Sequence, residues 1–182
     1  MSMNTKQTAA VSKSGYNTKE LVLDAMFIAL TYVFTAFVNV RLPIAANGGL
    51  IHLGNVPLFI CAILLGKRTG MLAGAFGMGL FDLLSGWTAW APFTFIIVGA
   101  MGYVVGAMTE GHHSTARDAA AIAAACVIKV AGYYIAEVII YHNLFCSCSF
   151  YSPENLVQIG TAAVIVLICV EQLRKVLRPI LK

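Results

Sequence analysis

The sequence predicts an all-α integral membrane protein, a bundle of six transmembrane helices with both termini in the cytoplasm. Of its 182 residues, 59% are hydrophobic and 11% are charged, a composition typical of polytopic membrane proteins. Its apolar segments approach the roughly 20 residues that a helix needs to cross a bilayer. Ten of the twelve basic residues fall on the side of the termini, which the positive-inside rule assigns to the cytoplasm. Those ten are Lys6, Lys13, Lys19, Lys67, Arg68, Arg117, Arg174, Lys175, Arg178 and Lys182.

The length of the chain limits what else it contains. Six or seven spans use nearly all 182 residues and leave no room for a separate soluble or nucleotide-binding domain. No phosphate-binding loop of the Walker type is present, so an ion gradient or a partner chain must supply any energy. We expect no cofactor, no metal site and no nucleic-acid partner, and we expect a lipid bilayer around the helices.

The chain divides into a polar tail and a membrane domain. Residues 1–18 are predicted to form a disordered cytoplasmic tail, and residues 19–182 a six-helix membrane domain. The spans are expected at about 19–38, 51–66, 69–84, 89–108, 118–142 and 154–173.

The first two spans carry the first candidate functional residues. Ala25 and Ala29 form a small-xxx-small step that allows another helix to approach closely. Asp24 lies near the cytoplasmic end, where we expect it to reach water. The stretch 41–50 contains Asn47 followed by two glycines and predicts a flexible loop, of a kind that often covers a site. The second span then places His52 and Asn55 near its outer end.

The stretch from the third span into the fourth is the most informative. The third span is rich in glycine, which favours tight helix contacts. It carries Asp82 into the membrane, where a carboxylate costs several kcal/mol unless it is paired or faces a cavity. Trp87 and Trp90 follow a Ser-Gly turn, either as interface anchors or as a surface on which a flat ligand stacks.

The fifth span predicts a row of functional side chains. Lys129, Tyr133 and Glu137 are four residues apart and therefore lie on one helix face. Lys129 and Asp82 are each about 18–20 Å from the cytoplasmic ends of their spans, so we expect them to meet directly or through water if the third and fifth helices are neighbours. An alternative is a pair that only holds helices together.

The ligand site is expected in the outer third of the bundle. Glu137 lies about 30 Å along its helix, near the level of the tryptophans. Its carboxylate accepts hydrogen bonds and Tyr133 donates one. The rival interpretation is a Glu137 that reaches outside water and tryptophans that anchor the interface. The candidate ligand-binding residues are Glu137, Tyr133, Trp87, Trp90, Asn47, His52, Asn55, Lys129, Asp82 and His142.

These features together resemble a known family. The alanine step, the run GLIHLGNVP from residue 49, and DLLSG from residue 82 followed by WAP from residue 90 are similar to S components of energy-coupling factor (ECF) transporters. The similarity covers about residues 20–178 and is strongest with the riboflavin-type branch, which includes members for hydroxymethylpyrimidine and pyridoxine-like vitamins. It implies an S component in a prokaryotic plasma membrane that captures a small vitamin or vitamin precursor from outside.

The resemblance also implies partners. A transmembrane coupling protein and two ECF ATPases would supply the energy, and Ala25 and Ala29 would contact the coupling protein. The chain itself would then be a transport subunit and not an enzyme. Two other classes remain open. A proton-coupled secondary transporter of a small heterocycle would use Asp82 and Glu137 as a relay, and a membrane enzyme would use them as acid and base.

Overall fold

The computed structural model describes residues 18–41, 50–111, 114–142 and 144–181. It contains six helices and one short hairpin in this part of the chain. The elements are α1 (Thr18–Phe37), β1 (Asn39–Arg41), β2 (Leu50–His52), α2 (Asn55–Leu65), α3 (Lys67–Leu84), α4 (Ala91–Thr109), α5 (Thr115–Tyr141) and α6 (Leu144–Leu181). The predicted tail lies outside the described residues except for Thr18.

Four helical segments are long and apolar enough to cross a membrane. They are Thr18–Phe37, Ala91–Thr109, Thr115–Tyr141 and the Asn155–Val176 part of α6. Helix α2 has 11 residues and is only about 16 Å long, short of the roughly 30 Å of a hydrocarbon core. Helix α3 begins with Lys67 and Arg68 and is less apolar. A helical membrane domain is therefore confirmed, whereas the count of six complete spans stays a prediction.

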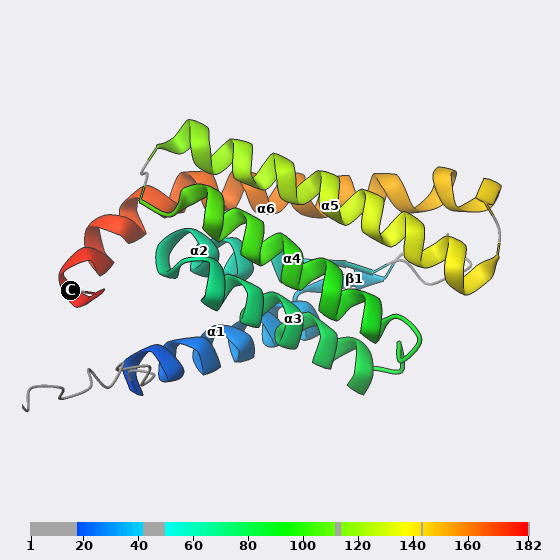
Figure 1. Cartoon of the computed structure of the whole chain (residues 1–182), viewed down its shortest axis with the longest axis horizontal. Coiled ribbons are helices and arrows are strands. Elements are labelled where there is room, and N and C mark those ends of the chain that lie inside the picture. The colour runs from blue at the N-terminus through cyan, green and yellow to red at the C-terminus, as the bar shows by residue number, and fades with distance from the viewer. Residues whose placement is uncertain (1–17, 42–49, 112–113, 143, 182) are drawn as a thin grey trace, which may run out of the picture.

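The helices pack in a layered arrangement in which α4 separates α3 from α5. Helix α4 contacts both of these neighbours, α1 packs on the other side of α3, and α6 lies along α5 (Figure 1). The short α2 is central and contacts α1, α3, α4 and α6. The hairpin connects the end of α1 to the start of α2, and β2 also contacts α6. We call the end of the bundle at which β1 and β2 lie the hairpin end; α3 and α5 also end there, and α4 begins there.

Two predicted loops contain regular structure. The flanks of the expected flexible loop pair as antiparallel strands, with Val40 opposite Ile51, so the second helix begins at Asn55 and not at residue 51. Branched side chains on both strands favour this pairing. The sequence also predicts a loop at 143–153, between the expected fifth and sixth spans, and this prediction is wrong from residue 144 onward because α6 is a single helix of 38 residues.

The predicted tight packing of the glycine-rich helix is confirmed between α3 and α4. A Cβ atom on Gly70 would lie 2.7 Å from the carbonyl oxygen of Gly102, and one on Gly74 would lie 2.5 Å from that of Val98. A Cβ on Gly102 would overlap the backbone of Gly70 itself. The two backbones therefore touch directly, without side chains between them.

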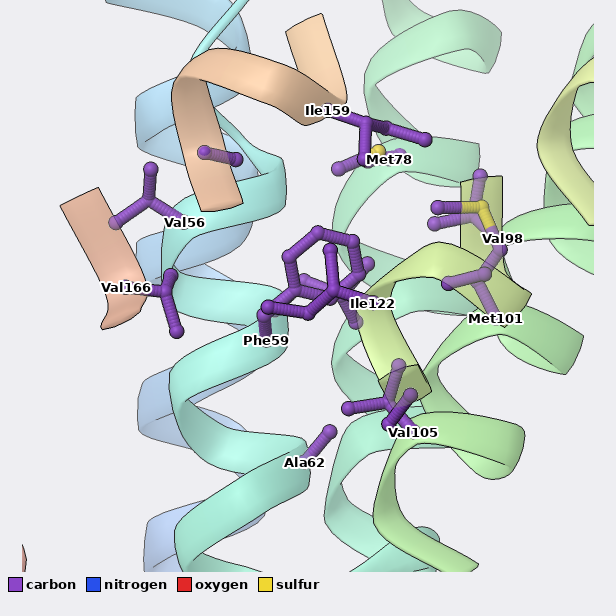
Figure 2. Close-up of a cluster of buried hydrophobic side chains, with 14 of the residues drawn as sticks. Val56, Phe59, Ala62, Met78, Val98, Met101, Val105, Ile122, Ile159 and Val166 are labelled. Atoms are coloured by element: carbon purple, nitrogen blue, oxygen red, sulfur yellow. The ribbon is translucent and has the colours of Figure 1, made fainter. Parts of the chain in front are cut away.

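One apolar core joins the helices around Phe59 of α2. Its ring is fully buried and lies among Val98, Met101, Ile122 and Val166, which come from α4, α5 and α6 (Figure 2). Because Phe59 faces this cluster, the face of α2 that carries it points toward the centre of the bundle.

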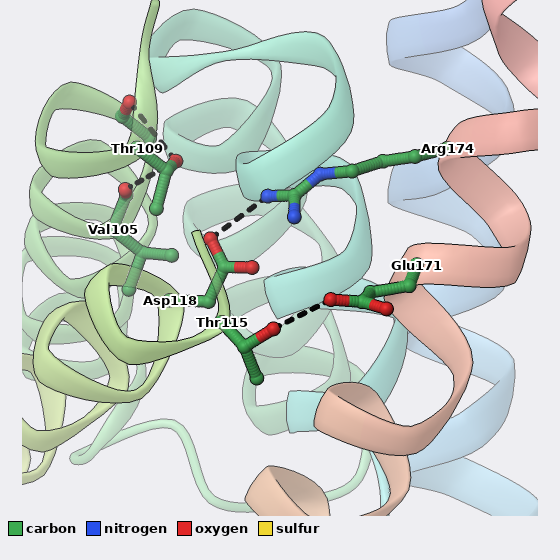
Figure 3. Close-up of polar contacts among 7 residues, drawn as sticks. Val105, Thr109, Thr115, Asp118, Glu171 and Arg174 are labelled. Atoms are coloured by element: carbon green, nitrogen blue, oxygen red, sulfur yellow. Dashed lines mark hydrogen bonds and ion pairs between the residues drawn. The ribbon is translucent and has the colours of Figure 1, made fainter. Parts of the chain in front are cut away.

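Ion pairs hold the helices together at the end opposite the hairpin. Asp118 of α5 is fully buried and pairs with Arg174 of α6 at 2.8 Å, and Thr115 donates to Glu171 at 2.6 Å (Figure 3). The expectation that Asp24 reaches water is wrong. It is buried, accepts a hydrogen bond from Thr69 at 2.7 Å and lies 3.3 Å from the Arg68 guanidinium.

Candidate ligand-binding site

A row of polar and aromatic side chains follows one face of α5 toward the hairpin end, where its last member, Tyr141, is exposed. Lys129, Tyr133, Glu137 and Tyr141 are spaced by four residues, so each lies one turn beyond the last. Lys129 and Glu137 are each only 3% exposed, although both are ionisable groups in an apolar helix. Such burial is costly without compensation, and it marks this face as the functional candidate.

Trp90 lies beside this row at the level of Glu137. Its ring centroid is 6.2 Å from that of Tyr133 and 6.1 Å from that of Tyr141, the residues one turn before and one turn after Glu137. Trp90 is 5% exposed and belongs to the core. This burial argues against the interface-anchor interpretation for Trp90. Trp87 is half-buried and packs against the same core.

Asp82 is connected to the row through a residue that the sequence did not single out. The Thr94 hydroxyl donates to an Asp82 carboxylate oxygen and lies 3.0 Å from the Tyr133 hydroxyl. Thr94 is four residues after Trp90, the N-cap of α4, and its amide donates to the Trp90 carbonyl at 2.9 Å, so the two residues lie one helical turn apart. The four-residue spacing from Trp90 is the feature of the sequence that could have identified Thr94 as a site residue.

Lys129 has a different partner from the one predicted. Its ammonium donates to the Gln158 side-chain oxygen at 2.6 Å and lies 6.0 Å from the centre of the Tyr133 ring. The Gln158 amide in turn donates to the backbone carbonyl of Leu50 in β2. Gln158 therefore links the buried ammonium of α5 to the hairpin, a role that no spacing in the sequence indicated.

Asp82 and Lys129 form no direct ion pair. Helix α4 lies between their helices, so the neighbour condition attached to that prediction is not met. They remain connected through Thr94 and Tyr133, whose ring lies beside the Lys129 ammonium.

The remaining candidates are spread around the hairpin end. His52 is half-buried and accepts a hydrogen bond from the Gly54 amide at 3.3 Å. Asn55 is fully buried at the start of α2. His142 is exposed at the end of α5, with a backbone φ of 54°. Asn47 lies outside the described residues. The described part of the chain contains no group of three His, Cys, Asp or Glu side chains that could hold a metal ion.

The alanine step lies on the opposite face of α1 from the core. Ala25 and Ala29 are both exposed, and they share this face with the exposed apolar side chains of Val22, Met26 and Val33. The buried residues of α1, among them Phe27 and Thr31, face the bundle instead.

These features define a class of protein: a small polytopic membrane protein whose helices enclose a polar site at one end. Comparison with known proteins then identifies the family. The chain belongs to the family described as ECF-type riboflavin transporter, S component, whose model matches residues 15–175. It is therefore an integral protein of a prokaryotic plasma membrane and a transporter subunit, not an enzyme.

Two curated relatives align with part of the chain. An uncharacterised protein from Pyrococcus woesei is 31% identical over 102 residues, which are 56% of this chain and 68% of that protein. The thiamine precursor transporter HmpT of Lactococcus lactis subsp. cremoris is 34% identical over 90 residues, which are 50% of this chain and 54% of that transporter. The chain thus spans about half the length of HmpT.

Proposed function

We propose that this chain is the substrate-binding S component of an ECF-type importer. In this proposal it captures a small vitamin or vitamin precursor from outside, with hydroxymethylpyrimidine or a pyridoxine-like vitamin as the best candidates. It then delivers the ligand through a transmembrane coupling protein that two ATPases drive. Membership of the S-component family and the similarity to a thiamine precursor transporter support this function.

The observation that carries the proposal is the polar cluster at the hairpin end. It combines a buried ammonium, two carboxylates, a tyrosine hydroxyl and an indole ring within otherwise apolar helices. Hydrogen-bonding groups around an aromatic surface suit a flat heterocycle with polar substituents. The absence of an arginine from the described cluster argues against a phosphorylated ligand. With both termini in the cytoplasm, as the basic residues predict, this end faces outside.

The exposed face of α1 suits the proposed coupling protein. Small side chains at Ala25 and Ala29 leave room for a second helix to approach the α1 backbone. The flanking exposed residues are apolar, as an interface within the membrane requires.

Substitutions at the site are expected to weaken ligand binding. Glu137→Gln removes a buried charge that accepts hydrogen bonds, and Trp90→Ala removes the ring between two tyrosines. Each should lower affinity at least tenfold, on the order of 1.4 kcal/mol. Isothermal titration of the purified protein with hydroxymethylpyrimidine and with pyridoxine measures this. Glu110→Gln is the matched control, because Glu110 is exposed and pairs with Lys67 at 2.9 Å at the opposite end. Wild-type affinity in both site variants would rule out this site.

Uptake of labelled ligand tests the division of labour. Cells that express the chain together with the coupling protein and both ATPases should accumulate ligand. Cells that express the chain with ATPases unable to hydrolyse ATP should bind ligand without accumulating it. Accumulation that persists without active ATPases and collapses with the proton gradient would instead establish a secondary transporter.

A further inference from the structure

Asn55 is a buried polar side chain without a hydrogen-bond partner among the described residues. It is 0% exposed, and both its amide nitrogen and its amide oxygen lack a partner in that part of the chain. An unpaired buried amide costs roughly 1–3 kcal/mol for each unsatisfied group. An apolar residue would avoid this cost, so the position calls for an explanation other than stability.

The Asn55 side chain faces the interior of the bundle toward the hairpin end. Asn55 precedes Phe59 by four residues, so both share one face of α2. Phe59 points into the apolar core, as Figure 2 shows. Asn55 therefore lies one helical turn nearer the hairpin than this core residue.

The backbone that carries Asn55 is held firmly in place. A Cβ atom on the preceding Gly54 would overlap the Thr35 hydroxyl of α1 and would lie 3.0 Å from the Met78 side chain of α3. It would also lie 3.1 Å from His52. Helix α2 thus starts closely packed against α1, α3 and β2.

The polar groups of the site surround this level of the bundle. His52 accepts a hydrogen bond from Gly54, the residue before Asn55, and Lys129 is joined to the same hairpin through Gln158, which donates to the Leu50 carbonyl. Asp82 at the end of α3 is joined through Thr94 to Tyr133, one turn beyond Lys129. Groups from α2, α3, α5 and β2 therefore lie at the hairpin end. The amide of Asn55 offers a separate donor and acceptor there that the described residues leave unused, and the hydroxyl of Ser85 at the end of α3 is likewise unused.

We infer that Asn55 determines ligand specificity by a two-point hydrogen bond to an amidine edge, in which an exocyclic amine adjoins a ring nitrogen, as in a 4-aminopyrimidine. The amide oxygen accepts from the amine and the amide nitrogen donates to the ring nitrogen, the same donor and acceptor roles that an asparagine amide takes toward N6 and N7 of adenine. A pyridine such as pyridoxine has no adjacent donor and acceptor of this kind. This inference rests on the proposed function and narrows its ligand to aminopyrimidines.

The test is a titration of the purified full-length protein with three probes. They are 4-amino-5-hydroxymethyl-2-methylpyrimidine, the same pyrimidine without its amine, and pyridoxine. The deaminated probe is chosen over a 4-oxo analogue because the asparagine amide can rotate by about 180°. After that rotation its nitrogen would donate to the oxo group and its oxygen would accept from the ring N–H, so the oxo form would also be bound. Wild-type protein should prefer the aminopyrimidine over each other probe by at least tenfold. A probe that lacks the amine or the ring nitrogen leaves the Asn55 amide without a hydrogen-bond partner in the complex, and this lost pairing lowers its affinity.

Asn55→Leu should lose that preference while the protein remains folded. Leucine has a similar volume and removes the unpaired amide, so the unfolding temperature of the ligand-free variant should equal or exceed that of the wild type. A purely structural amide would give the opposite shift. Asn55→Asp, which keeps the size but has only acceptors when ionised, is a second variant and should also lose at least tenfold in affinity for the aminopyrimidine.

Thr31→Val is the matched control. Thr31 is likewise fully buried, and its hydroxyl has no hydrogen-bond partner among the described residues, but it faces α3 from α1 and lies outside the polar cluster. Its affinity and its preference should match the wild type. If wild-type protein binds none of the three probes, the proposed function is wrong. If the wild type binds and both Asn55 variants keep its affinity and preference, the role of Asn55 is wrong and the proposed function stands.

Discussion

Gly102→Leu is expected to remove nearly all folded protein. Even the first carbon of the new side chain would overlap the Gly70 backbone, and neither partner is a flexible side chain that could move aside. Overpacking in a filled core costs about 1–3 kcal/mol when neighbouring side chains can adjust, so a clash between two backbones should exceed about 3 kcal/mol. The α3–α4 contact is the most extensive between helices, which leaves little room for a compensating shift.

The measurement is the yield of monodisperse protein in detergent and its thermal unfolding midpoint. Gly160→Leu is the matched control, because a Cβ at this exposed position of α6 meets nothing within 4 Å. This control should fold with a wild-type or higher midpoint, since glycine disfavours a helix interior by about 1 kcal/mol. A normal yield and midpoint for Gly102→Leu would show that the two backbones do not touch in the membrane.

Ala29→Trp is expected to abolish assembly with the coupling protein and leave ligand binding intact. The indole would fill the space that a second helix needs to reach the α1 backbone, and Ala25→Trp should act in the same way. Neither residue contacts the polar cluster, so titration of the isolated variant should return the wild-type affinity. Co-purification of the coupling protein and ligand uptake should both fall to background.

Ala123→Trp separates this effect from a general disturbance in the membrane. Ala123 is exposed on α5, so the same change in size occurs on another lipid-facing helix. This variant should assemble and transport normally. Retention of the coupling protein by Ala29→Trp at the wild-type level would reject the α1 face as the docking surface.

Composition and local spacing predicted much of the fold. The apolar helices, the close contacts of the glycines and the shared face of Lys129, Tyr133 and Glu137 all depend on residues near one another in the chain. The helix boundaries were less accurate at the hairpin and at residue 144, because apolar residues such as Ile51 suit a strand as well as a helix.

The partners within the site could not be predicted in the same way. Depth along a helix placed Asp82 and Lys129 at one level, but it carried no information about α4 between them. Thr94 and Gln158 matter because of which helices are neighbours, and a single sequence does not state that arrangement. Asp24 was misjudged for the same reason, since Arg68 and Thr69 of α3 enclose it.

The glycine contact also sets the alignment of the site at a distance. Gly70 meets Gly102, and Gly74, four residues further along α3, meets the backbone of Val98, four residues earlier on α4. Continuing by eight residues along α3 from Gly74 reaches Asp82, and going back by eight residues from Val98 reaches Trp90 at the start of α4. Asp82 and Trp90 therefore lie at the same level, with Thr94 one turn away. Because backbone meets backbone at the glycines, neither helix slides along the other by a fraction of a turn. The position of Asp82 relative to Trp90 and Thr94 thus depends on glycines that do not contact it. The glycine contacts fix the axial register of α3 against α4, and this register sets the geometry of the polar groups at the hairpin end.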